Sequence, residues 1–153
     1  MTHRRHICLS FALALLVGTP THAQERATRE EARALAEAAA AHLKKVGFDQ
    51  AAKDFNVDKA KWQPKDLYPF VQDFAGVMRF HANDKMMSRN VLELRDSNGK
   101  EFVKEMIRIA KGQGAGWIDY EWAHPQTRKV EDKSSYVVRI PGTELYVGVG
   151  VYR

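Results

Sequence analysis

The sequence predicts an α+β fold in which a long N-terminal helix packs on one face of an antiparallel β-sheet. Three observations indicate this class: an alanine-rich segment that opens with a helix start signal, a series of strand-like segments joined by short turns, and a last segment with strictly alternating residue types. Strands joined by short turns pair antiparallel, because parallel neighbours need a long crossover connection.

The long helix is predicted from Thr28 to Val46. Thr28 and Glu31 have the spacing of a capping box, in which each side chain accepts a hydrogen bond from the backbone N–H of the other residue. Apolar residues then recur at helical spacing, at Leu35, Ala39, Leu43 and Val46. Gly47 suits the position just after a helix. The alanines between residues 34 and 41 favour helix and allow close approach to a sheet.

A second amphipathic pattern runs from Phe48 to Asn56, and a β-hairpin is predicted after it. The segments 67–73 and 77–81 are rich in aromatic and β-branched residues and flank Gly76. Pro69 indicates that the first of these strands either begins there or lies at a sheet edge.

The C-terminal half is predicted to hold one more helix and three strands. The helix follows turn-type residues at 96–99, ends at glycines 112, 114 and 116, and has an apolar face formed by Phe102, Val103, Met106, Ile107 and Ala110. The strands are expected at 117–122, 134–140 and 145–152, with turns at 124–128 and at Pro141-Gly142.

The last strand has two distinct faces. Alternation places Leu145, Val147, Val149 and Val151 on one face and Tyr146, Gly148, Gly150 and Tyr152 on the other. The valine face suits packing under the long helix. The glycines of the other face either leave room for a ligand above the sheet or mark tight packing against a neighbouring element, and the strand alone does not separate these readings.

The amino terminus has the three parts of a secretory signal peptide. Arg4 and Arg5 precede an apolar run from Ile7 to Val17, and small residues follow up to Ala23. The run is shorter than the roughly 20 residues that cross a bilayer. We therefore expect a signal peptide at 1–23, a single domain at 24–153, and a periplasmic or secreted location.

The composition of the remaining chain excludes several chemistries. The only cysteine of the sequence, Cys8, lies in the predicted signal peptide. In the remaining chain, disulfides, thiolate metal sites and a cysteine nucleophile are therefore not expected. Without Arg4 and Arg5 the formal charge of +5 falls to about +3, with both signs interspersed, and nothing indicates nucleic-acid binding. The remaining histidines lie on separate elements, so neither a metal site nor a cofactor is predicted.

Catalysis is not expected either. Asp119 and Glu121 stand two apart on one strand and are interpreted as a solvated face rather than as an acid and base pair. No nucleophile elbow, phosphate-binding glycine loop or zinc-protease motif occurs in the sequence.

A set of motifs resembles a known family. In order, they are Asp66-Leu67-Tyr68-x-Phe70-Val71, Asp96-x-x-Gly99-Lys100-x-Phe102, Gly116-Trp117-x-Asp119-Tyr120-x-Trp122, Lys133-Ser134-Ser135-Tyr136-Val137 and Pro141-Gly142-Thr143 followed by Val147-Gly148-x-Gly150-Val151-Tyr152. Over essentially the whole mature chain, this order is similar to the single Cache domain, type 2.

The resemblance implies a PAS-like sheet with the long helix on one side and a small-molecule pocket on the other. It also implies an extracytoplasmic sensor, of a kind that often recognises small organic acids. Because the sequence reaches Arg153 directly after the last strand, we expect a free-standing form that acts through a membrane receptor or kinase partner. Arg128 occupies a turn position where relatives usually carry glycine.

The candidate ligand-binding residues follow from strand alternation and from the resemblance. Tyr120 and Trp122 share a strand face and are predicted to form pocket walls; the alternative is an ordinary aromatic core pair. Lys133 is predicted to neutralise a carboxylate, with hydroxyl donors on Ser134 and Tyr136, unless it is merely a solvated lysine.

Arg79 and His81 share a face of the strand that opens at Gly76, and one of them is predicted to be a second anion-binding group. The alternatives are a surface ion pair for Arg79 and a structural histidine for His81. The function that these residues suggest is binding of a small organic anion, with a non-catalytic interaction protein whose pocket is vestigial or lipid-filled as the alternative.

Overall fold

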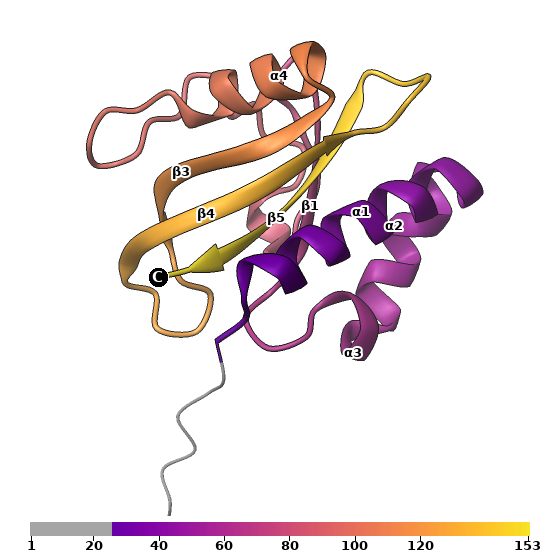
Figure 1. Cartoon of the computed structure of the whole chain (residues 1–153), viewed down its shortest axis with the longest axis horizontal. Coiled ribbons are helices and arrows are strands. Elements are labelled where there is room, and N and C mark those ends of the chain that lie inside the picture. The colour runs from indigo at the N-terminus through magenta and orange to yellow at the C-terminus, as the bar shows by residue number, and fades with distance from the viewer. Residues whose placement is uncertain (1–25) are drawn as a thin grey trace, which may run out of the picture.

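The structure is a computed structural model that describes residues 26–153, and the predicted signal peptide lies outside them. One antiparallel sheet has the strand order β2-β1-β5-β4-β3, with helices on both faces (Figure 1). The elements are α1 (Arg29–Val46), α2 (Phe48–Val57), α3 (Lys59–Trp62), β1 (Pro69–Asp73), β2 (Met78–Phe80), the 3-10 helix η1 (Asp84–Met86), α4 (Phe102–Gly112), β3 (Ala115–Ala123), β4 (Val130–Arg139) and β5 (Leu145–Tyr152). The predicted α+β class is confirmed.

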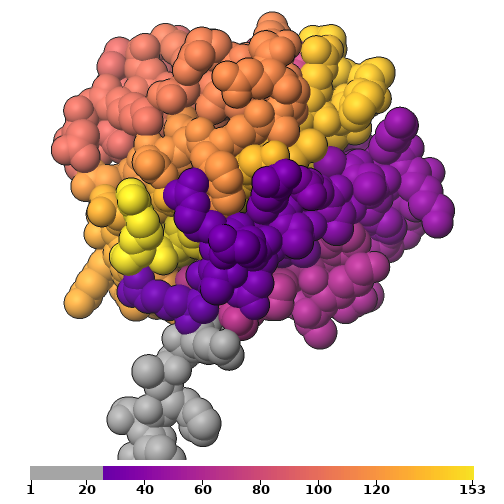
Figure 2. All heavy atoms as spheres, viewed as in Figure 1, coloured from indigo at the N-terminus to yellow at the C-terminus, as the bar shows by residue number. Residues whose placement is uncertain are grey.

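Helix α1 crosses one face of the sheet, as the alanine pattern predicts. The Thr28 hydroxyl accepts from the Glu31 N–H at 3.1 Å, and the Glu31 carboxylate accepts from the Thr28 N–H at 2.8 Å, so the capping box is formed. Ala32, Ala36 and Ala39 are fully buried. Figure 2 shows the indigo atoms of α1 lying across this face of the molecule.

Helix α4 covers the opposite face, over β3 and β4 (Figure 1). Its apolar residues, among them Phe102 and Met106, are buried in a core cluster with Phe70 and Tyr146 from the central strands. The segment between β2 and α4 has little regular structure beyond η1. This face of the sheet therefore lies under one helix and one irregular segment.

Strand β5 lies in the middle of the sheet, between β1 and β4. Val147 and Val149 are buried on the α1 side, and Tyr146 is buried on the α4 side, as strict alternation requires. The two predicted faces of this strand are confirmed.

Three local features differ from, or complete, the sequence reading. Helix α3 was not predicted, and it is a single turn capped by the Asp58 side chain. Pro69 begins β1, while the edge position belongs to β2. Arg128 has φ of 59°, the left-handed conformation for which glycine is suited. Within residues 26–153, none of the helices is both long enough and apolar enough to cross a bilayer.

Candidate ligand-binding site

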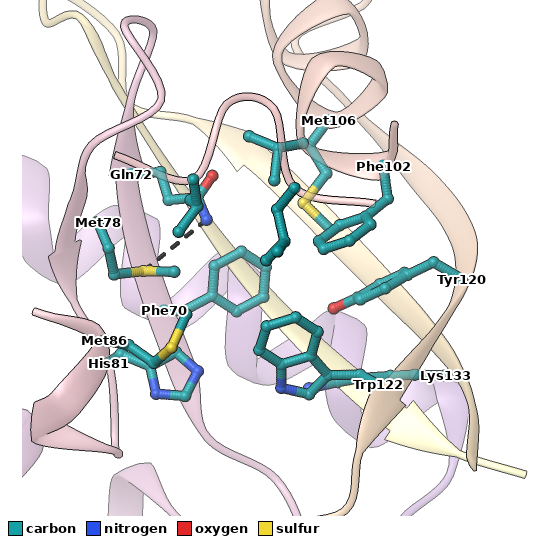
Figure 3. Close-up of a pocket in the computed structure, with 13 residues that line it drawn as sticks. Phe70, Gln72, Met78, His81, Met86, Phe102, Met106, Tyr120, Trp122 and Lys133 are labelled. Atoms are coloured by element: carbon teal, nitrogen blue, oxygen red, sulfur yellow. Dashed lines mark hydrogen bonds between the residues drawn. The ribbon is translucent and has the colours of Figure 1, made fainter. Parts of the chain in front are cut away.

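A small cavity lies between the sheet and the layer formed by α4 and the irregular segment. Its volume is about 20 Å³, which is room for about one water molecule. Figure 3 shows its side chains converging from several elements. The lining residues are Phe70, Gln72, Met78, His81, Met86, Val91, Leu94, Phe102, Val103, Met106, Tyr120, Trp122 and Lys133.

Tyr120 and Trp122 form one wall of this cavity. Alternation along β3 turns both rings toward α4, where Phe102 stacks on Tyr120 with ring centroids 4.6 Å apart and meets Trp122 edge-on at 5.6 Å. The Tyr120 hydroxyl lies 3.0 Å from the hydroxyl of Ser135 on β4. Burial raises the pKa of Tyr120, which therefore stays protonated at neutral pH.

Lys133 is the charged group of the cavity. Its side chain is only 1% exposed, and its ammonium donates to the Tyr68 hydroxyl oxygen at 2.7 Å. The Tyr68 and Tyr152 hydroxyls are 3.1 Å apart, and Tyr152 donates to the carbonyl of Ala123 at 3.1 Å. Because the Tyr152 proton goes to that carbonyl, the donors run in one direction, from Lys133 through Tyr68 to Tyr152.

Within residues 26–153, no carboxylate is in contact with the charge of Lys133. Burial opposes the ammonium form, but the oxygens of Tyr120 and Tyr68 counteract it, and the net effect raises the pKa of Lys133. Burial also raises the pKa of Tyr152, so the Tyr152 hydroxyl stays protonated at neutral pH and does not neutralise the lysine. Asp66 also raises the pKa of Lys133, by electrostatic attraction at a distance and without a hydrogen bond or ion pair among the described residues. The ammonium has three N–H donors, of which Tyr68 takes one.

Glycines on β5 make room for these side chains. A Cβ at Gly150 would lie 2.4 Å from Cε of Lys133, and a Cβ at Gly148 would lie 2.2 Å from Cζ of Phe70. The space above both glycines is therefore filled by residues that line the cavity. Of the two readings that the sequence left open, close packing is the one that the structure shows.

His81 lies across the cavity from Trp122 (Figure 3). It is 6% exposed, its Nδ1 accepts from the Asn83 N–H at 2.8 Å, and its ring meets Tyr68 edge-on at 5.2 Å. Burial, with the nearby charge of Lys133, lowers the pKa of His81 to about 4. The ring is therefore neutral at pH 7, with its proton on Nε2.

Four of the seven predicted site residues line the cavity: Tyr120, Trp122, Lys133 and His81. Arg79 does not; it is exposed on the edge strand β2, 3.8 Å from Asp73. Ser134 and Tyr136 point to the α1 side, where Ser134 donates to Asp119 and Tyr136 packs on Trp117. Ser134 and Tyr136 therefore do not join Lys133 at the cavity. Both lie an odd number of positions after Lys133 on β4, and alternation along a strand puts such residues on the opposite face.

Several residues in or beside the cavity were not singled out from the sequence. Phe70 lines the cavity, and Tyr68 and Tyr152 lie beside it in the hydrogen-bond chain of Lys133. Tyr68 and Phe70 belong to a motif that carries the family resemblance, and Tyr152 belongs to the glycine face of the last strand, so a signal for these existed. Met86, Val91 and Leu94 come from the irregular segment, whose sequence has no periodicity.

The fold is that of a PAS-like domain, with a small cavity between the sheet and the layer formed by α4 and the irregular segment. The family model of the Cache domain matches residues 32–153, and the chain belongs to this family. A solved Cache chemosensory domain, described for its carboxylic acid recognition, is 24% identical with a TM-score of 0.68, over 80% of this chain and 91% of that one. The periplasmic sensor domain of a chemotaxis protein is 27% identical with a TM-score of 0.63, over 80% and 88% of the two chains.

Two curated relatives are signal-transduction proteins. The sensor histidine kinase MctS of Rhizobium johnstonii is 37% identical over 89 residues, which are 58% of this chain and 19% of that protein. The methyl-accepting chemotaxis protein McpP of Pseudomonas putida is 31% identical over 88 residues, 57% of this chain and 16% of that protein. The matched segment thus spans less than a fifth of either relative.

Proposed function

We propose that this protein is a non-catalytic, extracytoplasmic sensor domain that binds a short-chain carboxylate against the ammonium of Lys133. The observation that carries the proposal is a buried lysine with no carboxylate in contact among residues 26–153. A buried charge is costly without a partner of opposite sign. An anionic ligand supplies that partner, and the two N–H donors that Tyr68 leaves free can bind its oxygens.

The neighbouring groups suit an acid with a small apolar body. Phe70, Trp122 and Met106 offer apolar surface beside Lys133. Because the cavity has room for about one water molecule, a ligand must displace a wall side chain. Met86 is the best candidate, since methionine is flexible and this one sits between the cavity and a wider hollow outside it.

The relatives support both the ligand class and the output. One similar domain is described for carboxylic acid recognition, and the curated relatives are a sensor kinase and a chemotaxis protein. We therefore propose that occupancy of the cavity is read by a membrane receptor or kinase of such a class.

Calorimetry with propionate and its uncharged analogue propionamide tests the ligand class. Wild-type protein should bind the acid, and Lys133→Met should lose about 1.5 to 3 kcal/mol for the acid, the strength of a hydrogen bond to a charged group. The same substitution should change amide binding much less. Lys44→Met, at an exposed position of α1, is the matched control.

Trp122→Ala separates wall contacts from the charge. It should weaken acid and amide together, because it removes apolar contact rather than a counter-charge. If no acid in a panel of short-chain acids binds, the carboxylate proposal is wrong and the interaction-protein alternative is favoured.

A further inference from the structure

A second and larger hollow, with a volume of about 700 Å³, opens beside the cavity. His81, Met86 and Trp122 line both spaces, so the hollow lies directly beside the cavity. Its lining residues are Tyr68, His81, Ala82, Asn83, Lys85, Met86, Trp122, Ala123, His124, Pro125 and Arg128. Tyr68 links the two spaces directly, because its hydroxyl accepts from Lys133.

Two buried histidines of the hollow are held in the same way. His81 is 6% exposed and His124 is 5% exposed. In each ring Nδ1 accepts a backbone N–H from the residue two positions later, Asn83 at 2.8 Å and Gln126 at 3.2 Å. The neutral tautomer of each ring therefore carries its proton on Nε2. Neither Nε2 has a hydrogen-bond partner among residues 26–153, which leaves two fixed donors at this site.

The charges around the hollow have one sign. Lys85 and Arg128 line it, and neither forms an ion pair within the described part of the chain. No carboxylate of the described residues lines either space. A concave site lined by positive charges and apolar walls concentrates the electric field and attracts anions.

We infer that this hollow is a second anion-binding subsite, so that the preferred ligand is a short dicarboxylate. One carboxylate lies at Lys133 in the cavity, and the other is held outside by the histidine Nε2–H donors of His81 and His124 and by the charges of Lys85 and Arg128. This inference rests on the proposed function for its inner carboxylate, and it adds an outer one that the inner site does not require.

Calorimetry at pH 7 with succinate and succinamate tests the inference, because the two ligands differ only in whether the second end is charged. Wild-type protein should bind succinate about tenfold more tightly than succinamate, as expected for one charge-assisted contact. The double variant Lys85→Gln/Arg128→Gly should reduce this ratio to about twofold. Glycine is chosen at position 128 because the backbone there has the left-handed conformation, which glycine adopts without strain. The double variant Lys44→Gln/Lys45→Gln makes the same charge change on α1 and should keep the wild-type ratio.

His124→Asn tests the histidine donors separately. The Asn side-chain oxygen can still accept the Gln126 N–H, so the local turn is kept while the Nε2–H is lost. Succinate should then bind about threefold to tenfold more weakly, with propionate unchanged.

The results distinguish this inference from the proposed function. If succinate and succinamate bind equally and the Lys85/Arg128 variant changes neither, the outer subsite is refuted while carboxylate binding stands. If neither propionate nor succinate binds to the wild-type protein, both proposals are wrong.

Discussion

The ammonium nitrogen of Lys133 lies 2.7 Å from the hydroxyl oxygen of Tyr68, a residue 65 positions earlier in the chain. The contact ties β4 to the segment just before β1, across the central strand β5. The ammonium also makes cation–π contacts, since it lies 4.2 Å from the centroid of the Tyr68 ring and 4.8 Å from that of the Tyr152 ring.

Tyr68→Phe should reduce the free energy of unfolding by about 2 kcal/mol, since a buried ammonium loses its hydrogen-bond acceptor. In a Lys133→Met background the same change should cost at least about 1 kcal/mol less, because the charge that needed the acceptor is gone. Urea unfolding of the four proteins measures this coupling. Tyr136→Phe, on the α1 side, is the control and should stay within about 0.5 kcal/mol of wild type. Equal costs of Tyr68→Phe in both backgrounds would mean that the lysine and tyrosine are not coupled.

His81 should make stability depend on pH. Its pKa falls from 6.5 to about 4 on folding, so between these values the unfolded chain binds more protons than the folded one. The stabilisation is fully present above the unfolded pKa and decreases as pH falls. Between pH 7 and pH 4, the loss due to His81 should reach about 3 kcal/mol.

His81→Asn isolates this term, because asparagine can accept the Asn83 N–H but does not titrate. The decrease in unfolding free energy between pH 7 and pH 4, measured by urea denaturation, should be smaller in the variant by about 3 kcal/mol. A variant with the wild-type pH dependence would show that His81 is protonated equally in both states.

Gly150→Ala should displace the Lys133 side chain. Its new Cβ would lie 2.4 Å from Cε of Lys133 and 2.3 Å from the hydroxyl oxygen of Ser135, so one of them must move. Overpacking of this kind costs about 1 to 3 kcal/mol in unfolding free energy. Propionate affinity should fall about tenfold, since 1.4 kcal/mol of misplaced contact suffices. Gly112→Ala, where the new Cβ would have no atom within 4 Å, is the control: it should leave propionate affinity unchanged and should not lower the free energy of unfolding. Wild-type affinity in Gly150→Ala would argue that Lys133 does not contact the ligand.

Arg128→Gly should stabilise the protein. The left-handed conformation at φ 59° strains any residue with a Cβ, and glycine relieves that strain while making the unfolded chain more flexible. The net gain should be about 0.5 to 1 kcal/mol by thermal or urea unfolding. Arg128→Ala keeps the Cβ and should give no gain. If alanine stabilises as much as glycine, the effect comes from losing the arginine rather than from the backbone.

Most of the architecture could be predicted because local signals agreed with the tertiary structure. The Thr28 capping box marks a helix start, and the amphipathic helix pattern and the alternating last strand each have a period that only one kind of element satisfies. Helix α3 was missed because four residues are too few to show a period. The order of strands in the sheet is not contained in any local pattern.

The site was predictable only where a long strand fixed the direction of a side chain. Tyr120 and Trp122 lie on the nine residues of β3, and their face followed from alternation. Alternation predicts that Arg79 and His81 share a strand face. Arg79 is exposed on a strand of three residues, and His81 is buried beyond the end of that strand, so the alternation does not extend to His81. The partnership of Lys133 with Tyr68 depends on the placement of β5 between their strands, which no spacing in the sequence indicates.

The central position of β5 also sets the order in which the molecule can be completed. The β1–β2 hairpin and the β3–β4 hairpin precede β5 in the chain, and neither pairs with the other until β5 joins both. A chain that leaves the ribosome or a translocation pore N-terminus first must therefore hold two separate halves until its last strand arrives. Such long-range pairing slows folding, and a chain cut short before β5 lacks both the floor of the cavity and the strand that joins its walls.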